Sequence, residues 1–275
     1  MGSENRNNGD LMPTPSHRVV FERAANRIVG PFARIDPNDW PLSTISPSEV
    51  LWRYMSYSKF EDILIKSALY FSRPDQFEDP FEGRFSPANA SKMSLSDQAF
   101  YSAYKNIAPH SAQSEGGNEV HRRCVFISCW HRNTKENRMM WDAYTRKSGA
   151  ESVVITSSAN ALLRFLPKEI MKSPLKYHDH DFPRTKFSHN ALFFYKPSEY
   201  GFEREFRLLR GLQPNESVSF DDPKDRGRYA SITLRKIIHR VITHPKATRD
   251  FKLRVDGMLQ KFLKHIKRED SSLVV

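Results

Sequence analysis

Residues 51–72 constrain the fold more than any other segment. The segment opens with a run typical of a short strand, residues 51–55, and closes with a second such run, residues 69–72. Between them, Ser58 and Glu61 have the S-x-x-E spacing of a capping box at a helix start, and apolar side chains follow at helical spacing. A strand–helix–strand unit excludes an all-helical or all-strand protein, so we expect an α+β fold.

The rest of the chain continues this mixture of two periodicities. We expect further strands over residues 123–130, 151–156, 192–195, 202–209 and 237–243, and helices over residues 98–107, 136–145, 157–165 and 248–265. Strands and helices in this order predict mixed or antiparallel sheets with flanking helices.

The predicted elements suggest one main domain. We expect residues 1–48 to form a peripheral N-terminal extension with one short helix within 17–34, because polar residues and prolines punctuate it. Residues 49–268 are predicted to form a single α+β domain with an insert at about 86–120. Residues 269–275 are expected to be a tail.

Charge and cysteine usage indicate the surroundings of the protein. The formal net charge is +11, which favours a polyanionic partner such as nucleic acid or a phosphate-bearing ligand. The only cysteines, Cys124 and Cys129, are five residues apart in one expected strand, which puts them on opposite faces and predicts no bridge between them. We therefore expect a cytoplasmic protein, and no apolar run is long enough to predict a membrane span.

Several kinds of site are disfavoured by the motifs. The sequence has no G-x-x-x-x-G-K-[ST], no G-x-G-x-x-G and no G-x-S-x-G. His121, Cys124, Cys129 and His131 lack the usual spacing of zinc ligands, and the ligand-rich residues 177–181 read as a polar loop. We expect no metal site.

Glu203 and Glu205 are the most suggestive acidic pair. Two carboxylates spaced by two lie on one face of a strand and repel each other, so neighbouring cations must stabilise them. Arg204 and Arg207 flank the pair, and Arg53 could reach it across a sheet. Spacing alone favours an exposed edge strand, but paired carboxylates beside a sugar can also stabilise an oxocarbenium-like state.

Trp141 and Tyr144 form an aromatic pair three residues apart, on one face of an expected helix. Such pairs more often pack in a core than stack on a ligand. Both interpretations stay open at this stage.

Five blocks together resemble a bacterial family called domain of unknown function 2971. They are LWRYMS at 51–56, LYFSRPDQFEDPFEG at 69–83, ISCWH to MMWDAY at 127–144, GFEREFRLL at 201–209 and VITHPKAT at 241–248. The DPFEG and MMWDAY blocks are the most specific. The family name implies no activity.

The order of the blocks is also similar to that of the ADP-ribosyltransferase fold, in which an early strand carries Arg or His and a late strand carries a catalytic Glu, often as E-x-E. The similarity implies NAD as substrate. Arg53 would contact its phosphates or ribose, Tyr144 or Trp141 would stack on the nicotinamide, Glu205 would hold the ribose hydroxyl and stabilise developing positive charge, and Glu203 would deprotonate the acceptor. The implied set comprises Glu205 and Glu203 as catalytic residues and Arg53, Tyr54, Ser128, Trp141 and Tyr144 around the NAD.

The acceptor, a nucleic acid or a protein, is not identified by the sequence, and neither is the oligomeric state. A second hypothesis is a non-enzymatic nucleic-acid-binding or phage-defence-associated module, supported by the net charge and by the basic C-terminal helix with Lys252, Lys261 and Lys264. A third is a metal-dependent phosphodiester hydrolase with ligands Glu78, Asp79 and Glu82.

Overall fold

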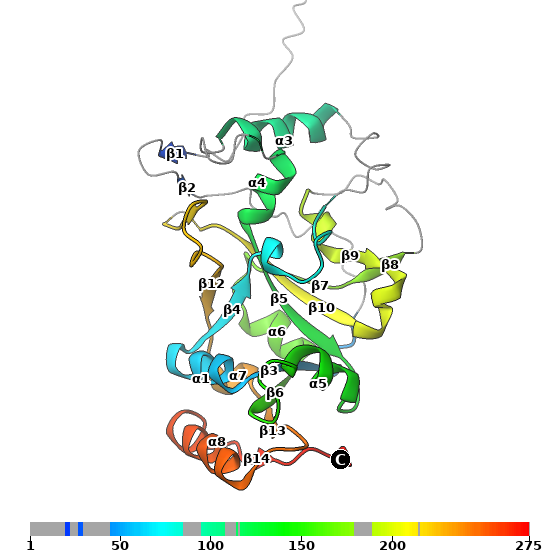
Figure 1. The fold of residues 1–275 in the computed structure, drawn as a ribbon, viewed down its shortest axis with the longest axis vertical. Helices are drawn as coiled ribbons and strands as arrows, with labels where there is room; N and C mark the ends of the chain where they lie inside the picture. The colour runs from blue at the N-terminus through cyan, green and yellow to red at the C-terminus, as the bar shows by residue number, and fades with distance from the viewer. Residues whose placement is uncertain are drawn as a thin grey trace, which may run out of the picture.

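A computed structural model describes residues 20–22, 27–29, 45–84, 95–107, 114, 116–178, 189–213 and 215–274 (Figure 1). Its strands are β1 (Val20–Glu22), β2 (Arg27–Val29), β3 (Val50–Ser56), β4 (Ala68–Ser72), β5 (Val125–Arg132), β6 (Ser152–Ser158), β7 (Met171–Pro174), β8 (Lys176–His178), β9 (Tyr195–Pro197), β10 (Glu205–Gly211), β11 (Ser217–Ser219), β12 (Gly227–Ser231), β13 (Arg240–Thr243) and β14 (Arg268–Glu269). Its α-helices are α1 (Tyr57–Lys66), α3 (Leu95–Ile107), α4 (Gly117–Arg123), α5 (Arg138–Thr145), α6 (Ala159–Phe165), α7 (Leu234–Ile237) and α8 (Arg249–Phe262), and its 3₁₀ turns are η3 (Pro74–Gln76), η5 (His189–Phe194) and η6 (Ser198–Glu203).

A nine-stranded sheet organises the molecule. Its main path is β12-β4-β5-β3-β6-β13-β14, and β10 pairs with both β5 and β7. Every pairing in this sheet is antiparallel except that of β13 with β14. Figure 1 shows the sheet between α3 and α4 at one end of the molecule and α8 at the other. The expected α+β class with a mostly antiparallel sheet and flanking helices is confirmed.

Strand β5 is the branching point of the sheet. One edge pairs with β10 over its whole length, from Val125 to His131. The other edge meets β4 only at Ile127 and β3 only at His131 and Arg132. Residues 128–130 therefore have no strand partner on that edge, and β3 and β4 diverge there.

The alternation of strand β3 supplies side chains to two core clusters. Leu51 and Met55 join the largest cluster, which includes buried side chains of α1, α6 and α8. Trp52 and Tyr54 join a second cluster with Met140 and Trp141 of α5. Helix α5 consequently covers the face of β3 opposite to α1 and α8.

The local structure differs from the sequence prediction at several places, and the strand expected over 237–243 begins only at Arg240. Helix α1 is capped by Ser56 rather than Ser58. Within 17–34, where a helix was expected, the described residues form β1 and β2, which pair with each other while β2 also pairs with β11. Residues 192–195 fall mostly in the 3₁₀ turn η5, and the strand expected over 202–209 begins only at Glu205.

The last described residues pack against the main domain. β14 pairs with β13, and Glu136 accepts hydrogen bonds from Ser271 Oγ (2.6 Å) and Ser272 N (2.8 Å). Within the described ranges, no helix has both the length and the apolar character required to cross a membrane.

Candidate functional site

Glu205 and Arg207 lie at the centre of the candidate site. Strand β10 lies between β5 and β7, so its side chains are buried, which corrects the expectation of an exposed edge strand. Glu205 is 2% exposed and Arg207 0%. The guanidinium donates from Nε to Glu205 Oε1 (3.1 Å) and from Nη2 to Glu205 Oε2 (2.9 Å). This bidentate pair is the strongest geometry available to an arginine and a carboxylate.

A second carboxylate, that of Glu82, accepts hydrogen bonds from the same guanidinium. Arg207 donates from Nη1 to Glu82 Oε1 (2.5 Å) and from Nη2 to Glu82 Oε2 (2.7 Å). Its Nη1 also donates to the Phe193 carbonyl at 2.6 Å. These five bonds involve all three guanidinium nitrogens, so Arg207 is saturated by its own protein.

Lys196 of β9 joins the two glutamates that the sequence singled out. Its Nζ is 2.7 Å from Glu203 Oε2 and 3.7 Å from Glu205 Oε2. Glu203 is the last residue of η6, and Arg204 between the two glutamates adopts a left-handed backbone conformation (φ 41°). The carboxylates therefore converge on one cation, although they do not share a strand face as predicted.

The two carboxylates have pKa values shifted in opposite directions. Burial by itself would raise the pKa of Glu205, but Arg207 and Lys196 outweigh it and hold the pKa below its usual range. Burial and the neighbouring charge on Glu205 raise the pKa of Glu203. A pair separated in this way can offer one ionised stabiliser and one proton acceptor.

Side chains from three further elements surround Glu205. The Cys129 thiol hydrogen-bonds its carboxylate, and the Tyr177 hydroxyl accepts from its backbone N–H at 2.8 Å. His131 is held by a bond of 2.5 Å between its Nδ1 and the Glu203 carbonyl. Tyr144 of α5 is 43% exposed, and its low-polarity surroundings together with Glu205 and Cys129 raise the pKa of its hydroxyl.

Arg53 lies in the split between β3 and β4. Its Nη2 donates to the Tyr70 carbonyl of β4 at 2.8 Å, and its guanidinium carbon is 5.9 Å from the centre of the Trp130 ring. Among the described residues, its Nη1 is buried without a hydrogen-bond partner and no carboxylate pairs with it. Burial lowers the pKa of Arg53 to about 10, and Cys129 and Tyr144 lie within range of its charge.

The other predicted site residues occupy different surroundings. Tyr54 and Trp141 are packed edge to face with ring centres 5.0 Å apart. The Tyr54 hydroxyl accepts from Asn137 N, and Trp141 is 1% exposed with its Nε1 donating to Glu136, so both belong to the core beneath α5. Ser128 is 1% exposed, and its hydroxyl has no partner within the described part of the chain.

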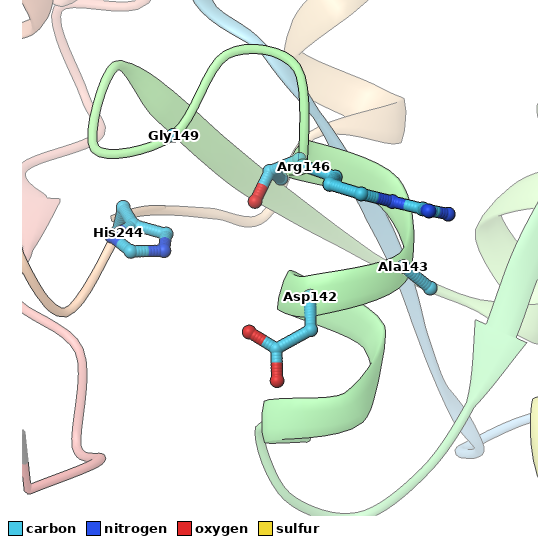
Figure 2. A pocket seen from close by; sticks show the side chains of 6 residues that line it. Asp142, Ala143, Arg146, Gly149 and His244 are labelled. Carbon is cyan, nitrogen blue, oxygen red and sulfur yellow. The ribbon is translucent and has the colours of Figure 1, made fainter.

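Two surface hollows lie away from this site. One of about 460 Å³ is lined by Asp142, Ala143, Thr145, Arg146, Gly149 and His244. Figure 2 shows the Asp142 carboxylate and the His244 ring beside the hollow, while the Arg146 side chain points away from it. The other, of about 450 Å³, lies between residues 165–168 and 231–233. Neither is lined by Arg53, Tyr144 or Glu205.

The metal-dependent alternative finds no support in the described residues. They contain no group of three or more His, Cys, Asp or Glu side chains able to hold a metal ion. Glu82 is committed to Arg207, and the Glu78 side chain is 82% exposed. Cys124 and Cys129 are free thiols, as predicted. Residues 179–181 of the ligand-rich loop lie outside the described residues.

Sequence reasoning missed several members of the cluster. Arg207 was noted only as a flanking charge, and Glu82 only as a candidate metal ligand. Lys196, Tyr177 and Cys129 were not connected to the acidic pair. The one available signal was the DPFEG block, whose glutamate needs a partner because its side chain is buried. Lys196 and Tyr177 approach through tertiary contacts that no local pattern indicates.

Comparison with known proteins adds a distant structural likeness. No protein-family model matches the chain, so the similarity to domain of unknown function 2971 stays a prediction. No curated protein matches it either. Similar solved structures include DarT from Thermus sp. 2.9 in complex with ADP-ribosylated ssDNA (11% identity, TM-score 0.37), with carba-NAD+ (11%, 0.35) and with NAD+ (10%, 0.37). The alignments cover 84%, 83% and 83% of this chain and 96% of each DarT chain. A likeness of this size shows nothing about the activity of this chain.

Proposed function

We propose that the chain is an NAD-dependent ADP-ribosyltransferase that transfers ADP-ribose to a macromolecular acceptor. The observation that supports this is the combination of two carboxylates with opposite pKa shifts and a partly buried guanidinium, that of Arg53, which has no carboxylate partner among the described residues. The carboxylates suit chemistry at a sugar carbon, and the guanidinium suits a phosphate-bearing substrate.

Arg53 is the residue proposed to bind the pyrophosphate. A cation with a buried, unpartnered Nη1 is unfavourable, and an anionic ligand would supply both a counter-charge and an acceptor for that atom. The unpartnered Ser128 hydroxyl, two residues from Trp130 on the same strand, offers a second donor. The exposed ring of Tyr144 is proposed to stack on the nicotinamide. Tyr54 and Trp141, which pack against each other in the core, would support helix α5 from beneath.

Glu205 and Glu203 are proposed to act at the anomeric carbon. The bond between ribose C1′ and the nicotinamide nitrogen breaks, and the nicotinamide leaves with the electron pair. Ionised Glu205 holds a ribose hydroxyl and stabilises the positive charge that develops at C1′. The acceptor atom then bonds to C1′, and its proton passes to Glu203, whose raised pKa suits a base.

The acceptor is proposed to be nucleic acid, with protein as the alternative. The support is the net charge of +11, which favours a polyanion at the surface.

Glutamine at position 205 tests the proposal. Glu205→Gln keeps the shape of the side chain but removes its charge, so nicotinamide release from NAD+ should fall by about 100-fold or more. Glu199→Gln removes a charge from an exposed position in the preceding turn and should leave the rate unchanged. The measurement is nicotinamide release by chromatography, with labelled NAD+ offered to single-stranded DNA, RNA and protein. Wild-type protein that releases no nicotinamide with any acceptor, or a fully active Glu205→Gln, contradicts the proposal.

A further inference from the structure

We propose that Glu82 is a positioning residue that acts through Arg207 on the Glu203–Glu205 pair. Its role in catalysis rests on the proposed function, whereas its effect on the two carboxylates can be measured independently. The loop that carries Glu82 comes from a part of the chain 123 residues before Glu205, yet both carboxylates hold the same guanidinium.

The loop is fixed so that Glu82 cannot easily leave Arg207. Gly83 has φ +68°, and a Cβ there would lie 2.1 Å from Cε1 of Phe193, the residue whose carbonyl also accepts from Arg207. Arg122 donates to the Glu82 carbonyl at 2.7 Å, and Asn118 donates to the Gly83 carbonyl at 3.2 Å. Glycine is required by both the backbone conformation and the close approach.

Glu82 and Glu205 share the single positive charge of Arg207. Arg207 contributes one positive charge, which Glu82 and Glu205 divide in a buried setting where screening is weak. If Glu82 were neutral, the positive charge of Arg207 would be balanced by Glu205 alone. The positive potential that Arg207 produces at Glu203 would then be stronger. The described groups that face the pair are Glu82 of the loop, Cys129 and His131 of β5, Tyr144 of α5, Tyr177 of β8, Lys196 of β9, Tyr200 of η6 and Arg207 of β10.

The sign of the effect follows from these charges. Glu203 feels the negative charge of Glu205 and the positive charges of Lys196 and Arg207. Removing a buried negative charge favours the ionised form of Glu203, so its titration should move to lower pH, by about one pH unit. A residue that served only to stabilise the loop would lower stability without moving this titration.

The test uses the full chain with Glu82→Gln, Glu82→Asp and the control Glu78→Gln. Glu78 lies in the same acidic segment, but its side chain is 82% exposed. The carboxyl carbon of Glu203 is followed by ¹³C NMR between pH 3 and pH 9, with its resonance assigned from a Glu203→Gln spectrum. Glu82→Gln should shift the Glu203 midpoint downward, Glu82→Asp should shift it in the same direction by less, and Glu78→Gln should leave it in place.

An unchanged midpoint in Glu82→Gln, or an equal shift in Glu78→Gln, overturns the proposal. If Glu82→Gln fails to fold, Glu82→Asp decides by the same criterion, because the shorter side chain withdraws the carboxylate from Arg207. In protein that releases nicotinamide, the acid limb of kcat against pH should move with the NMR midpoint. Absence of any nicotinamide release in wild-type protein would defeat the proposed function, while the NMR comparison would still decide the role of Glu82.

Discussion

Arg207 and Arg53 belong to one sheet but have opposite surroundings. Arg207 is saturated by two carboxylates and a carbonyl, which raise its pKa against the effect of burial. Arg53 has one carbonyl, the face of Trp130 and an unpartnered Nη1, and its pKa is lowered to about 10. The first arginine maintains the fold, and the second has the properties of a ligand-binding group.

Methionine at position 53 should separate stability from binding. Replacing a half-buried, poorly paired cation by an apolar side chain of similar length is expected to leave the free energy of unfolding unchanged or to raise it by about 1 kcal/mol. Wild-type protein at NAD+ concentrations of 100 Kd should gain about 2.7 kcal/mol, and Arg53→Met should lose that gain. Urea denaturation with and without NAD+ measures both quantities.

The matched control is Arg207→Met. It leaves the buried Glu82 without its cation and Glu205 with only Lys196, 3.7 Å away, so it should destabilise the protein by about 3–5 kcal/mol. Arg53→Met protein that is stabilised by NAD+ as much as the wild type would remove Arg53 from the proposed binding site.

The sequence indicated which residue types matter but not which of them meet. Arg53 was expected to reach the Glu203–Glu205 pair, yet the contacts to these carboxylates come from Arg207 and Lys196. Charge pairing depends on the packing of strands that are distant in sequence. The local spacing of residues therefore cannot predict which cation pairs with a given carboxylate.

At the scale of elements, periodicity predicted six strands of the nine-stranded sheet, β3, β4, β5, β6, β10 and β13, and the helices α1, α3, α5, α6 and α8, but it missed β7, β12 and β14. Its errors fall on short segments: residues 192–195 are apolar enough for a strand but lie mostly in η5, and the strand expected from residue 202 starts at Glu205 because Arg204 adopts φ 41°. Short apolar runs fit several backbone conformations equally well, so tertiary packing decides between them.

Adjacent serines at the start of α6 allow a test of helix capping. The Ser158 side chain accepts from Ala161 N at 3.1 Å, whereas the buried Ser157 hydroxyl has no partner among the described residues. Ser158→Ala should lower the free energy of unfolding by about 1 kcal/mol. Ser157→Ala should have no effect or a small stabilising one. Equal losses in urea denaturation would show that the cap is not the source of the stability.

At the scale of the molecule, the net charge of +11 is only partly free to attract a polyanion. Lys252 of the C-terminal helix is 2.9 Å from Asp270, and Arg268 pairs with Asp256 at 3.1 Å. Lys261 and Lys264 are exposed. The basic C-terminal helix expected from the sequence is therefore partly neutralised by acidic side chains in the structure.

Binding of a single-stranded oligonucleotide should weaken steeply with salt. The logarithm of the affinity should fall linearly with the logarithm of the salt concentration, and reversing Lys261 and Lys264 to Glu should reduce the slope by about 1 for each phosphate that the variant no longer neutralises. Fluorescence anisotropy between 50 mM and 200 mM salt measures this. Nicotinamide release without oligonucleotide serves as the control and should change little. Affinity that does not vary with salt would argue for a protein acceptor.

The assembly of Glu82, Arg207 and Glu205 also limits how this sequence can drift over generations. A lysine at position 207 could not make the hydrogen bonds that Arg207 makes to two carboxylates and a carbonyl. An ammonium group has only three N–H donors and lacks the planar arrangement of the guanidinium. Loss of Arg207 alone would leave the buried Glu82 without a cation and Glu205 with only Lys196, and loss of both acids would leave the buried guanidinium without a counter-charge. Divergent relatives should therefore keep all three residues or have replaced them together, and a set of homologous sequences would reveal the three positions as one inherited unit.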